Sequence, residues 1–376
     1  MIIGIDGNEA NIREKVGIGQ YAYQTLKHIF LIWNKKSESE KKLLNFKIYL
    51  KDKPRDDLPK ENSWWKYKVF GPKNFWTQIA LPYQLFFDKE PPNIFFTPSH
   101  YAPRFSSCPR VISIMDLSFI YYPNLFLKKD LHQLRAWTDY SVKKAIKILT
   151  ISEFSKNEII KYYKVPENKV VVTYPGYNHK IYKKSSTLKI KNYNISDDYI
   201  LFVGTLQPRK NIVKLIEAFN ILIRKYDKKT TQLILVGKKG WLYDEIFRVV
   251  KELNLEKRVI FTDFIADEDL AVLYQRARCF VLPSLYEGFG IPVIEAMACG
   301  CPVVASNISS LPEIVGKAGI LIDPENAEDI AEGIYKAGFN SLKRKEIIKS
   351  GFERIKLFSW EKCAEKTLEV LKMAIS

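Results

Sequence analysis

Apolar runs of strand length alternate with helical patterns along nearly the whole chain, and this alternation restricts the fold more than any other feature. A strand, a crossover helix and a second strand form the unit of a parallel sheet, so the pattern predicts an α/β fold with doubly wound sheets. In the first half the predicted strands are Ile2–Ile5, Phe46–Leu50, Asn93–Phe96, Val111–Met115, Ile148–Ile151 and Val170–Thr173. The helical patterns there lie at Gln20–Trp33, Leu131–Lys144 and Ser155–Tyr163.

The alternation is lost once, between Tyr174 and Asp198, and then starts again. This stretch holds Pro175, Gly176 and many lysines, as a polar connector does. Because 376 residues suggest about two domains of ordinary size, we predict a domain at 1–178, a linker at 179–198 and a second domain at 199–357. The second domain has predicted strands at Tyr199–Gly204, Gln232–Gly237, Val259–Thr262, Cys279–Leu282 and Val303–Ala305.

Composition is that of a globular protein, with 47% hydrophobic residues and no apolar run near the ~20 residues that cross a bilayer. The chain starts directly with the strand pattern Met1–Ile5 and shows no basic and apolar leader, so we expect no secretion. Its five cysteines are odd in number and have no metal-ligand spacing, which fits reduced thiols in a cytoplasmic protein.

The net charge is +17, and residues 1–180 hold 29 Lys and Arg against 17 Asp and Glu, which leaves +12 in that half and +5 in the rest. A basic half attracts phosphate ligands, anionic membranes or nucleic acid, although a lysine-rich composition gives the same charge. The aromatic and basic run Ser63–Lys68, with Phe75 and Trp76 beyond it, fits either a membrane interface or rings packed in the core.

The segment around Glu287 carries the most specific chemistry. The apolar strand Cys279–Leu282 leads into a turn with Gly288 and Gly290, and then into a helix that has Pro292 among its first residues. The glycines let backbone approach a ligand, and the start of the helix offers N–H donors for phosphate. Carboxylates at Glu287 and Glu295 suit the hydroxyls of a nucleotide sugar; an ordinary strand–turn–helix connection with solvated acids is the alternative.

Arg209 and Lys210 follow the first strand of the second half and precede a helix. Two cations at a helix start can clamp a diphosphate, Arg209 with its planar fork and Lys210 as a point charge. A solvated pair in a loop is the alternative reading.

Four other positions carry open interpretations. Asp116 ends a strand and either faces a ligand or caps the next turn, and Ser152 is predicted to cap a helix. His100 follows a strand and either faces a cleft or is a satisfied loop histidine. Asp267 is expected to cap the helix that follows Phe264.

These residues resemble the family 4 retaining glycosyltransferases, whose Glu-x7-Glu signature Glu287 and Glu295 match. Further similarity lies at Ala296–Ser306, Leu311–Glu313, Gly17–Gly19, Ile151–Ser155 and Val203–Asn211. The resemblance implies the GT-B fold: two Rossmann-like doubly wound domains that face a central cleft, an N-terminal acceptor domain and a C-terminal donor domain. Residues 358–376 would form a helix that returns to the N-terminal domain.

The resemblance also implies roles for single residues. Arg209 and Lys210 would neutralise the donor diphosphate, Glu287 would bind sugar hydroxyls, and Glu295 would bind the ribose hydroxyls. Asp116 would act on the acceptor side, and with Glu287, Arg209 and Lys210 it completes the expected catalytic set. The remaining donor-binding residues would be Gly17, Gly19, Thr205, Phe264, Gly288, Phe289, Gly290 and Ile291. The chain departs from many relatives in having Met115 in place of a histidine and Thr205 in place of an arginine.

We therefore expect a retaining, metal-independent hexosyltransferase with no cofactor besides its donor, GDP-mannose being favoured over UDP- or ADP-sugars. Its acceptor would be a glycan or a lipid-linked sugar, and the basic first domain would touch an anionic membrane at its cytoplasmic face. A sugar-nucleotide epimerase or phosphorylase of the same fold is the alternative. A nucleic-acid-binding protein is a remote alternative, because no nucleic-acid-binding motif accompanies the positive net charge.

Overall fold

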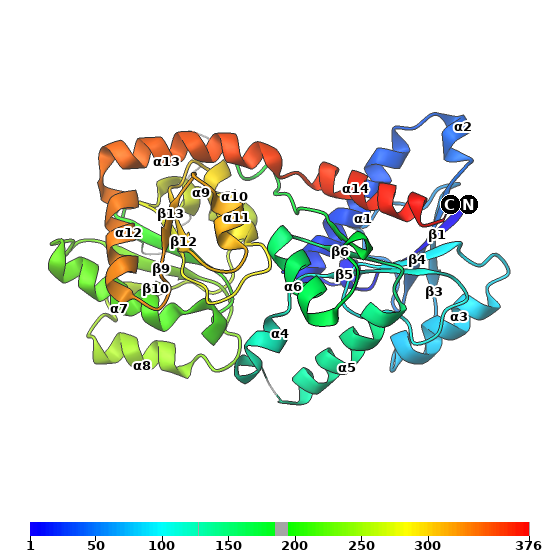
Figure 1. The fold of residues 1–376 in the computed structure, drawn as a ribbon. Helices are drawn as coiled ribbons and strands as arrows, with labels where there is room; N and C mark the ends of the chain where they lie inside the picture. The colour runs from blue at the N-terminus through cyan, green and yellow to red at the C-terminus, as the bar shows by residue number, and fades with distance from the viewer. Residues whose placement is uncertain (127, 185–194, 376) are drawn as a thin grey trace. The chain divides into compact units, whose positions relative to one another are not determined.

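The computed structural model describes residues 1–126, 128–184 and 195–375. The chain divides into two compact units, each built on its own sheet (Figure 1). The first unit combines Met1–Pro175 with the segment from Ser359 onward, and the second is Gly176–Phe358. Of the linker expected at 179–198, the described residues belong to the second unit, and 185–194 lie outside the described part.

The first unit contains a seven-stranded parallel sheet in the order β3-β2-β1-β4-β5-β6-β7. Its strands are β1 (Ile2–Asp6), β2 (Asn45–Leu50), β3 (Trp65–Val69), β4 (Ile94–Thr97), β5 (Arg110–Ile114), β6 (Lys147–Thr150) and β7 (Val170–Val172). Its helices are α1 (Ile18–Asn34), α2 (Glu38–Lys41), α3 (Leu81–Phe87), α4 (Ser118–Tyr121), α5 (Lys128–Lys144), α6 (Glu153–Tyr163) and α14 (Trp360–Met373). Short turns of other helix types are η1 (Glu9–Asn11), η2 (Trp76–Ala80), η3 (Pro123–Leu125) and η4 (Glu167–Lys169).

The strand β3 lies in the aromatic and basic run and is an element that the sequence pattern missed. Trp65 is fully buried, and its ring lies 5.2 Å from that of Phe46 and 5.3 Å from that of Phe30. Trp64 and Trp76 are buried as well. The core reading is therefore confirmed for these three rings.

The second unit contains a six-stranded parallel sheet in the order β10-β9-β8-β11-β12-β13. Its strands are β8 (Tyr199–Val203), β9 (Gln232–Val236), β10 (Val259–Phe261), β11 (Phe280–Leu282), β12 (Val303–Ser306) and β13 (Ile320–Ile322). Its helices are α7 (Ile212–Lys225), α8 (Asp244–Glu252), α9 (Asp267–Arg276), α10 (Ile291–Ala298), α11 (Leu311–Val315), α12 (Ala327–Phe339) and α13 (Ser341–Arg354), with η5 (Pro208–Lys210) and η6 (Ile355–Leu357).

The last helix, α14, packs on the first unit. The Trp360 ring lies 6.3 Å from that of Tyr21 on α1, and the Cys363 thiol donates to the carbonyl of Thr173 at 3.6 Å. None of the helices in the described part is both long and apolar enough to span a bilayer.

Candidate functional site

The candidate site of the second unit lies where the strand order of its sheet reverses. From β8 the strands follow one another in one direction across the sheet, and from β11 they follow in the opposite direction. Doubly wound sheets bind their ligands at the carboxyl ends of such a strand pair. The loops that follow these two strands are tied together: the Leu285 N–H donates to the carbonyl of Arg209 at 2.9 Å. The amide of Asn211 donates to the carbonyls of Pro283 and Pro324, at 3.1 Å and 2.7 Å.

Two glycines make these loops possible. A Cβ at Gly237 would lie 2.1 Å from the carbonyl oxygen of Gly204, so the loops after β8 and β9 can approach only without a side chain there. Gly290 has a φ of 97° and directly precedes α10, where it turns the chain into the helix. Because α10 begins at Ile291, the N–H groups at its start have no carbonyl of the same helix to bind.

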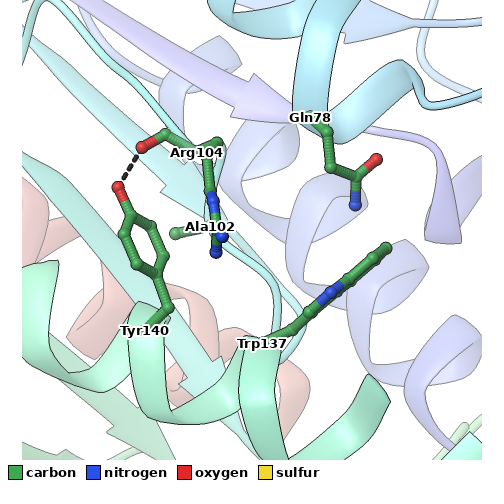
Figure 2. A pocket seen from close by; sticks show the side chains of 5 residues that line it. All are labelled: Gln78, Ala102, Arg104, Trp137 and Tyr140. Atoms are coloured by element: carbon green, nitrogen blue, oxygen red, sulfur yellow. Dashed lines mark hydrogen bonds between the residues drawn. The ribbon is translucent and has the colours of Figure 1, made fainter.

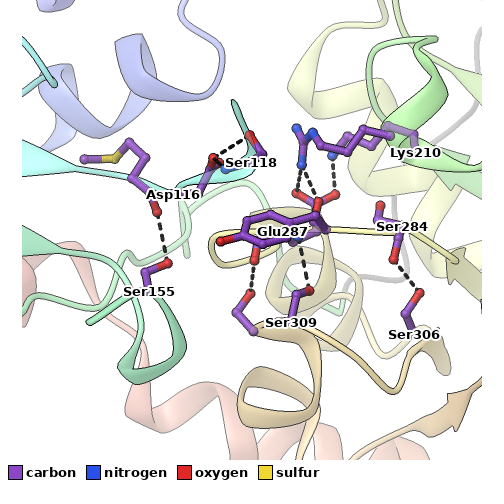
Figure 3. Close-up of polar contacts among 12 residues, drawn as sticks. Asp116, Ser118, Ser155, Lys210, Ser284, Glu287, Ser306 and Ser309 are labelled. Atoms are coloured by element: carbon purple, nitrogen blue, oxygen red, sulfur yellow. Dashed lines mark hydrogen bonds and ion pairs between the residues drawn. The ribbon is translucent and has the colours of Figure 1, made fainter. Parts of the chain in front are cut away.

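Arg209, Lys210 and Glu287 form a buried charge triad between the two loops. Figure 3 shows the ion pair of Lys210 with Glu287. The Arg209 guanidinium lies 3.1 Å from one carboxylate oxygen of Glu287, and Lys210 Nζ lies 2.5 Å from the other. Arg209 also donates to the carbonyl of Tyr286, which fixes the plane of its guanidinium. The side chains of Arg209, Lys210 and Glu287 are only 16%, 12% and 8% exposed.

The triad keeps Glu287 ionised. Burial alone would raise the pKa of this carboxyl, but the charges of Lys210 and Arg209 outweigh burial and lower the pKa to about 2. The triad itself consists of two cations and one anion, so the three side chains together carry a net charge of +1. The arrangement can therefore bind an anion and, through Glu287, accept hydrogen bonds from hydroxyls.

The backbone of Glu287 is held by serines that the sequence reasoning missed. The Glu287 N–H donates to the Ser309 hydroxyl at 3.1 Å, and the Ser310 hydroxyl donates to the Glu287 carbonyl at 2.9 Å. Both serines follow β12, the next strand of the sheet, so their position after a predicted strand was the signal that could have found them.

Glu295 occupies a different environment on α10. The Tyr274 hydroxyl lies 3.4 Å from its carboxylate, and burial, together with the nearby charge of Asp267, raises the pKa of Glu295 to about 8. Burial raises the pKa of Asp267 as well, and the nearby Tyr182 only partly opposes this shift. The prediction that Asp267 caps its helix is wrong, because the residue at the cap position is Ala266, without a side-chain cap, and Asp267 is the first residue of α9 itself.

The other residues predicted to bind the donor from the second unit lie in loops after its strands. Thr205 lies in the loop after β8, and Gly288 lies in the turn after Glu287. Phe289 is buried, with its ring 5.4 Å from that of Phe358, so only its backbone can face a ligand. Phe264 is 55% exposed after β10, and Lys238 Nζ lies 5.6 Å from the centre of its ring.

The remaining predicted residues belong to the first unit. Gly17, with a φ of 51°, precedes α1, and a Cβ at Gly19 would lie 2.6 Å from Ile12. Asp116 follows β5 and accepts from the N–H and hydroxyl of Ser118, at 2.8 Å and 2.6 Å, which confirms that it caps the next turn. Ser152 caps α6, as predicted, by accepting from the Ser155 N–H at 3.0 Å.

The first unit also has a pocket of about 140 Å³ lined by Gln78, Ala102, Arg104, Trp137 and Tyr140 (Figure 2). The Arg104 guanidinium lies 4.8 Å from the centre of the Tyr140 ring, whose hydroxyl donates to the Arg104 carbonyl. Aromatic faces with a few hydrogen-bonding groups are typical of sites for small polar ligands. Within the described residues, no three His, Cys, Asp or Glu side chains are grouped as they would be to hold a metal ion.

Comparison with known proteins shows which family and which relatives this chain resembles. Residues 185–354 match the model of the family described as glycosyl transferases group 1. The chain is 36% identical over 252 residues to O-antigen chain mannosyltransferase B of Escherichia coli, which covers 66% of this chain and 64% of that protein. It is 31% identical over 217 residues to O-antigen chain mannosyltransferase RfbU of Salmonella typhimurium. This alignment covers 58% of this chain and 57% of that protein. The match thus spans less than two thirds of either relative.

Solved structures agree on the fold. Sucrose-phosphate synthase from Thermosynechococcus elongatus superposes with a TM-score of 0.76 at 20% identity, over 99% of this chain and 98% of that one. WaaG, a glycosyltransferase involved in lipopolysaccharide biosynthesis, superposes with a TM-score of 0.71 at 15% identity, over 99% of both chains. Residues 185–354 are therefore similar to the glycosyl transferases group 1 family, and the chain has the GT-B fold of two Rossmann-like domains.

Proposed function

We propose that this protein is a retaining, metal-independent hexosyltransferase that moves mannose from GDP-mannose to a glycan or lipid-linked acceptor. The observation that carries the proposal is the Arg209–Lys210–Glu287 triad at the carboxyl ends of β8 and β11, beside the start of α10. Mannose is favoured because the relatives named above are O-antigen mannosyltransferases.

In the proposed reaction, an acceptor hydroxyl attacks the anomeric carbon on the face from which the diphosphate leaves. The bond between that carbon and the diphosphate oxygen breaks through an oxocarbenium-like state, and the hydroxyl proton passes to the departing diphosphate. Arg209 and Lys210 stabilise the negative charge that develops on the leaving group, an electrostatic role that fixed cations can fill without a metal ion. Glu287 orients the sugar by accepting from its hydroxyls.

Ligand screening and product analysis test the proposal. A ligand that binds only the native state raises its stability, by about 2.7 kcal/mol at one hundred times its Kd. We expect GDP to raise the melting temperature more than UDP or ADP does. Radiolabelled GDP-mannose should then give a mannosylated acceptor with retained anomeric configuration. Release of an epimerised sugar nucleotide or of a sugar phosphate would favour the alternative enzymes instead.

Glu295 provides a pH-dependent test of its expected contact with the ribose. The raised pKa keeps its carboxyl largely protonated at pH 7, whereas an ionised carboxylate accepts stronger hydrogen bonds from hydroxyls. We therefore expect GDP affinity to rise roughly fivefold as the pH increases from 6.5 to 9. Between pH 7.5 and 9, where the terminal phosphate of GDP is already ionised, the Glu295→Gln variant should bind GDP with a flat profile, measured by isothermal titration. A slope that persists in the variant contradicts the assignment.

An apolar surface on the first unit supports the proposed membrane contact. Phe75, Ile79, Tyr83, Phe86 and Phe87 are all more than half exposed along η2 and α3. The opposite face of the same segment is buried through Trp76, Leu81 and Leu85. Such a segment, in a half of the chain with a net charge of +12, suits the interface of an anionic bilayer.

Vesicle binding tests this surface. We expect the Ile79→Ser/Phe87→Ser variant to lose most of its sedimentation with vesicles that contain phosphatidylglycerol. Leu342→Ser removes an even more exposed apolar side chain from the second unit and is the control, which should bind like the unmodified protein. Equal binding by all three proteins contradicts the contact.

A further inference from the structure

His100 carries a hydrogen-bond donor that the fold leaves unused. It follows β4, and its Nε2 accepts from the backbone N–H of Met115 at 3.3 Å. A backbone N–H can only donate, so in the neutral ring the proton must sit on Nδ1. Nδ1 is buried, and none of the described residues accepts from it. The reading of His100 as a satisfied loop histidine is therefore wrong for this nitrogen.

The imidazole is held neutral and in place. Burial lowers the pKa of His100, and the nearby charge of Asp116 only partly opposes this shift. The ring lies 6.0 Å from that of Phe119, measured between centres, so its orientation is fixed by packing as well as by the bond to Met115. A buried N–H without an acceptor costs about 1–3 kcal/mol, which a ligand oxygen at this position would recover.

Asp116 supplies a hydrogen-bond acceptor on the loop that follows the neighbouring strand β5. It is the residue after Met115, and both of its bonds from Ser118 go to the same oxygen, Oδ1. No described residue donates a hydrogen bond to Oδ2. β4 and β5 are neighbouring strands, and the order of this sheet reverses between β1 and β4, so both residues follow strands at the edge where doubly wound sheets bind ligands.

We propose that His100 binds a sugar substrate directly, its Nδ1–H donating to one hydroxyl oxygen while Asp116 Oδ2 accepts from a neighbouring hydroxyl. The inference rests on the proposed glycosyl transfer and assigns that reaction a further substrate-binding residue. A vicinal pair of hydroxyls offers one oxygen that accepts and one that donates, which is the complement of this pair of groups.

Two substitutions separate this role from a structural one. In His100→Asn the side-chain NH₂ takes the place of Nδ1–H, while the acceptor for Met115 is lost. In His100→Gln the side-chain oxygen takes the place of Nε2 and keeps the bond to Met115, but the donor is lost. If His100 binds substrate, His100→Gln raises the KM of one sugar substrate about tenfold and His100→Asn changes it less than about threefold.

The KM values of the two substrates show whether His100 binds the acceptor or the donor sugar. A rise in acceptor KM alone assigns the hydroxyls to the acceptor, and a rise in donor KM with unchanged GDP affinity assigns them to the donor hexose. His132→Gln, at an exposed position of α5, is the matched control. Activity that survives in His100→Gln but falls in His100→Asn overturns the inference, since only the bond to Met115 then matters. Absence of transfer in the unmodified protein would instead overturn the proposed function.

Discussion

Replacing Glu287 with glutamine is expected to lower kcat/KM for sugar transfer by about 100-fold to 1000-fold, comparable to the loss of one preorganised contact to a transition state. The amide keeps the shape of the carboxylate but not its charge. It can no longer accept charge-assisted bonds from sugar hydroxyls or orient Arg209 and Lys210 through both oxygens. Initial rates with labelled GDP-mannose measure the effect, and a variant with ordinary turnover would remove Glu287 from the mechanism.

Alanine at the same position is expected to act on stability as well. Without the carboxylate, Arg209 and Lys210 become two largely buried cations with no counter-charge from Glu287, and breaking a buried pair costs about 3–5 kcal/mol. We expect Glu287→Ala to unfold at lower denaturant concentration and to regain part of the difference when GDP is bound, because its phosphates supply the missing charge. Glu217→Ala, which breaks a more exposed pair with Lys214 on α7, is the control and should change stability little.

The same triad gives the stability a defined pH dependence. The folded pKa of Glu287 is about 2, below its ordinary value of 4.5. The ionised carboxylate therefore stabilises the fold fully above pH 4.5, and this contribution is lost as the pH falls from 4.5 through 2.

The alternation of strands and helices predicted most of the fold because buried parallel strands are nearly continuous apolar runs. β1, β2, β4, β5, β6 and β7 all overlap the predicted ranges. β3 was missed because an edge strand is only half buried, so Trp65 alternates with the exposed Lys66 and resembles a surface segment. β13 was missed because Ile320–Ile322 is too short to show a period.

The candidate site was predicted less completely than the fold. Sequence position identified Arg209, Lys210 and Glu287 separately, since each follows a strand in the predicted sheet. Their mutual ion pairs join residues more than seventy positions apart, and no local pattern encodes such a contact. The unused donor of His100 likewise depends on packing between distant elements, which periodicity does not reveal.

Removing both cations is expected to weaken GDP binding by about 100-fold to 1000-fold in the Arg209→Ala/Lys210→Ala variant. Each charge-assisted bond to phosphate contributes about 1.5–3 kcal/mol, and the two side chains lie where solvent screens them little. Isothermal titration of GDP measures the loss. Lys225→Ala/Lys229→Ala removes the same charge from exposed positions of the second unit and should leave the affinity within about twofold.

Guanosine separates a phosphate clamp from a general disturbance of the pocket. It lacks the diphosphate, so its affinity should be nearly the same for the unmodified protein and for the double variant. Arg209→Lys should lie between the two, because an ammonium group keeps the charge but lacks the planar fork that reaches both Tyr286 and Glu287. If guanosine and GDP lose affinity equally in the double variant, the cations shape the loop and do not grip the diphosphate. The charge on the leaving group would then need another source of stabilisation, since the catalytic role proposed for Arg209 and Lys210 requires direct contact with that group.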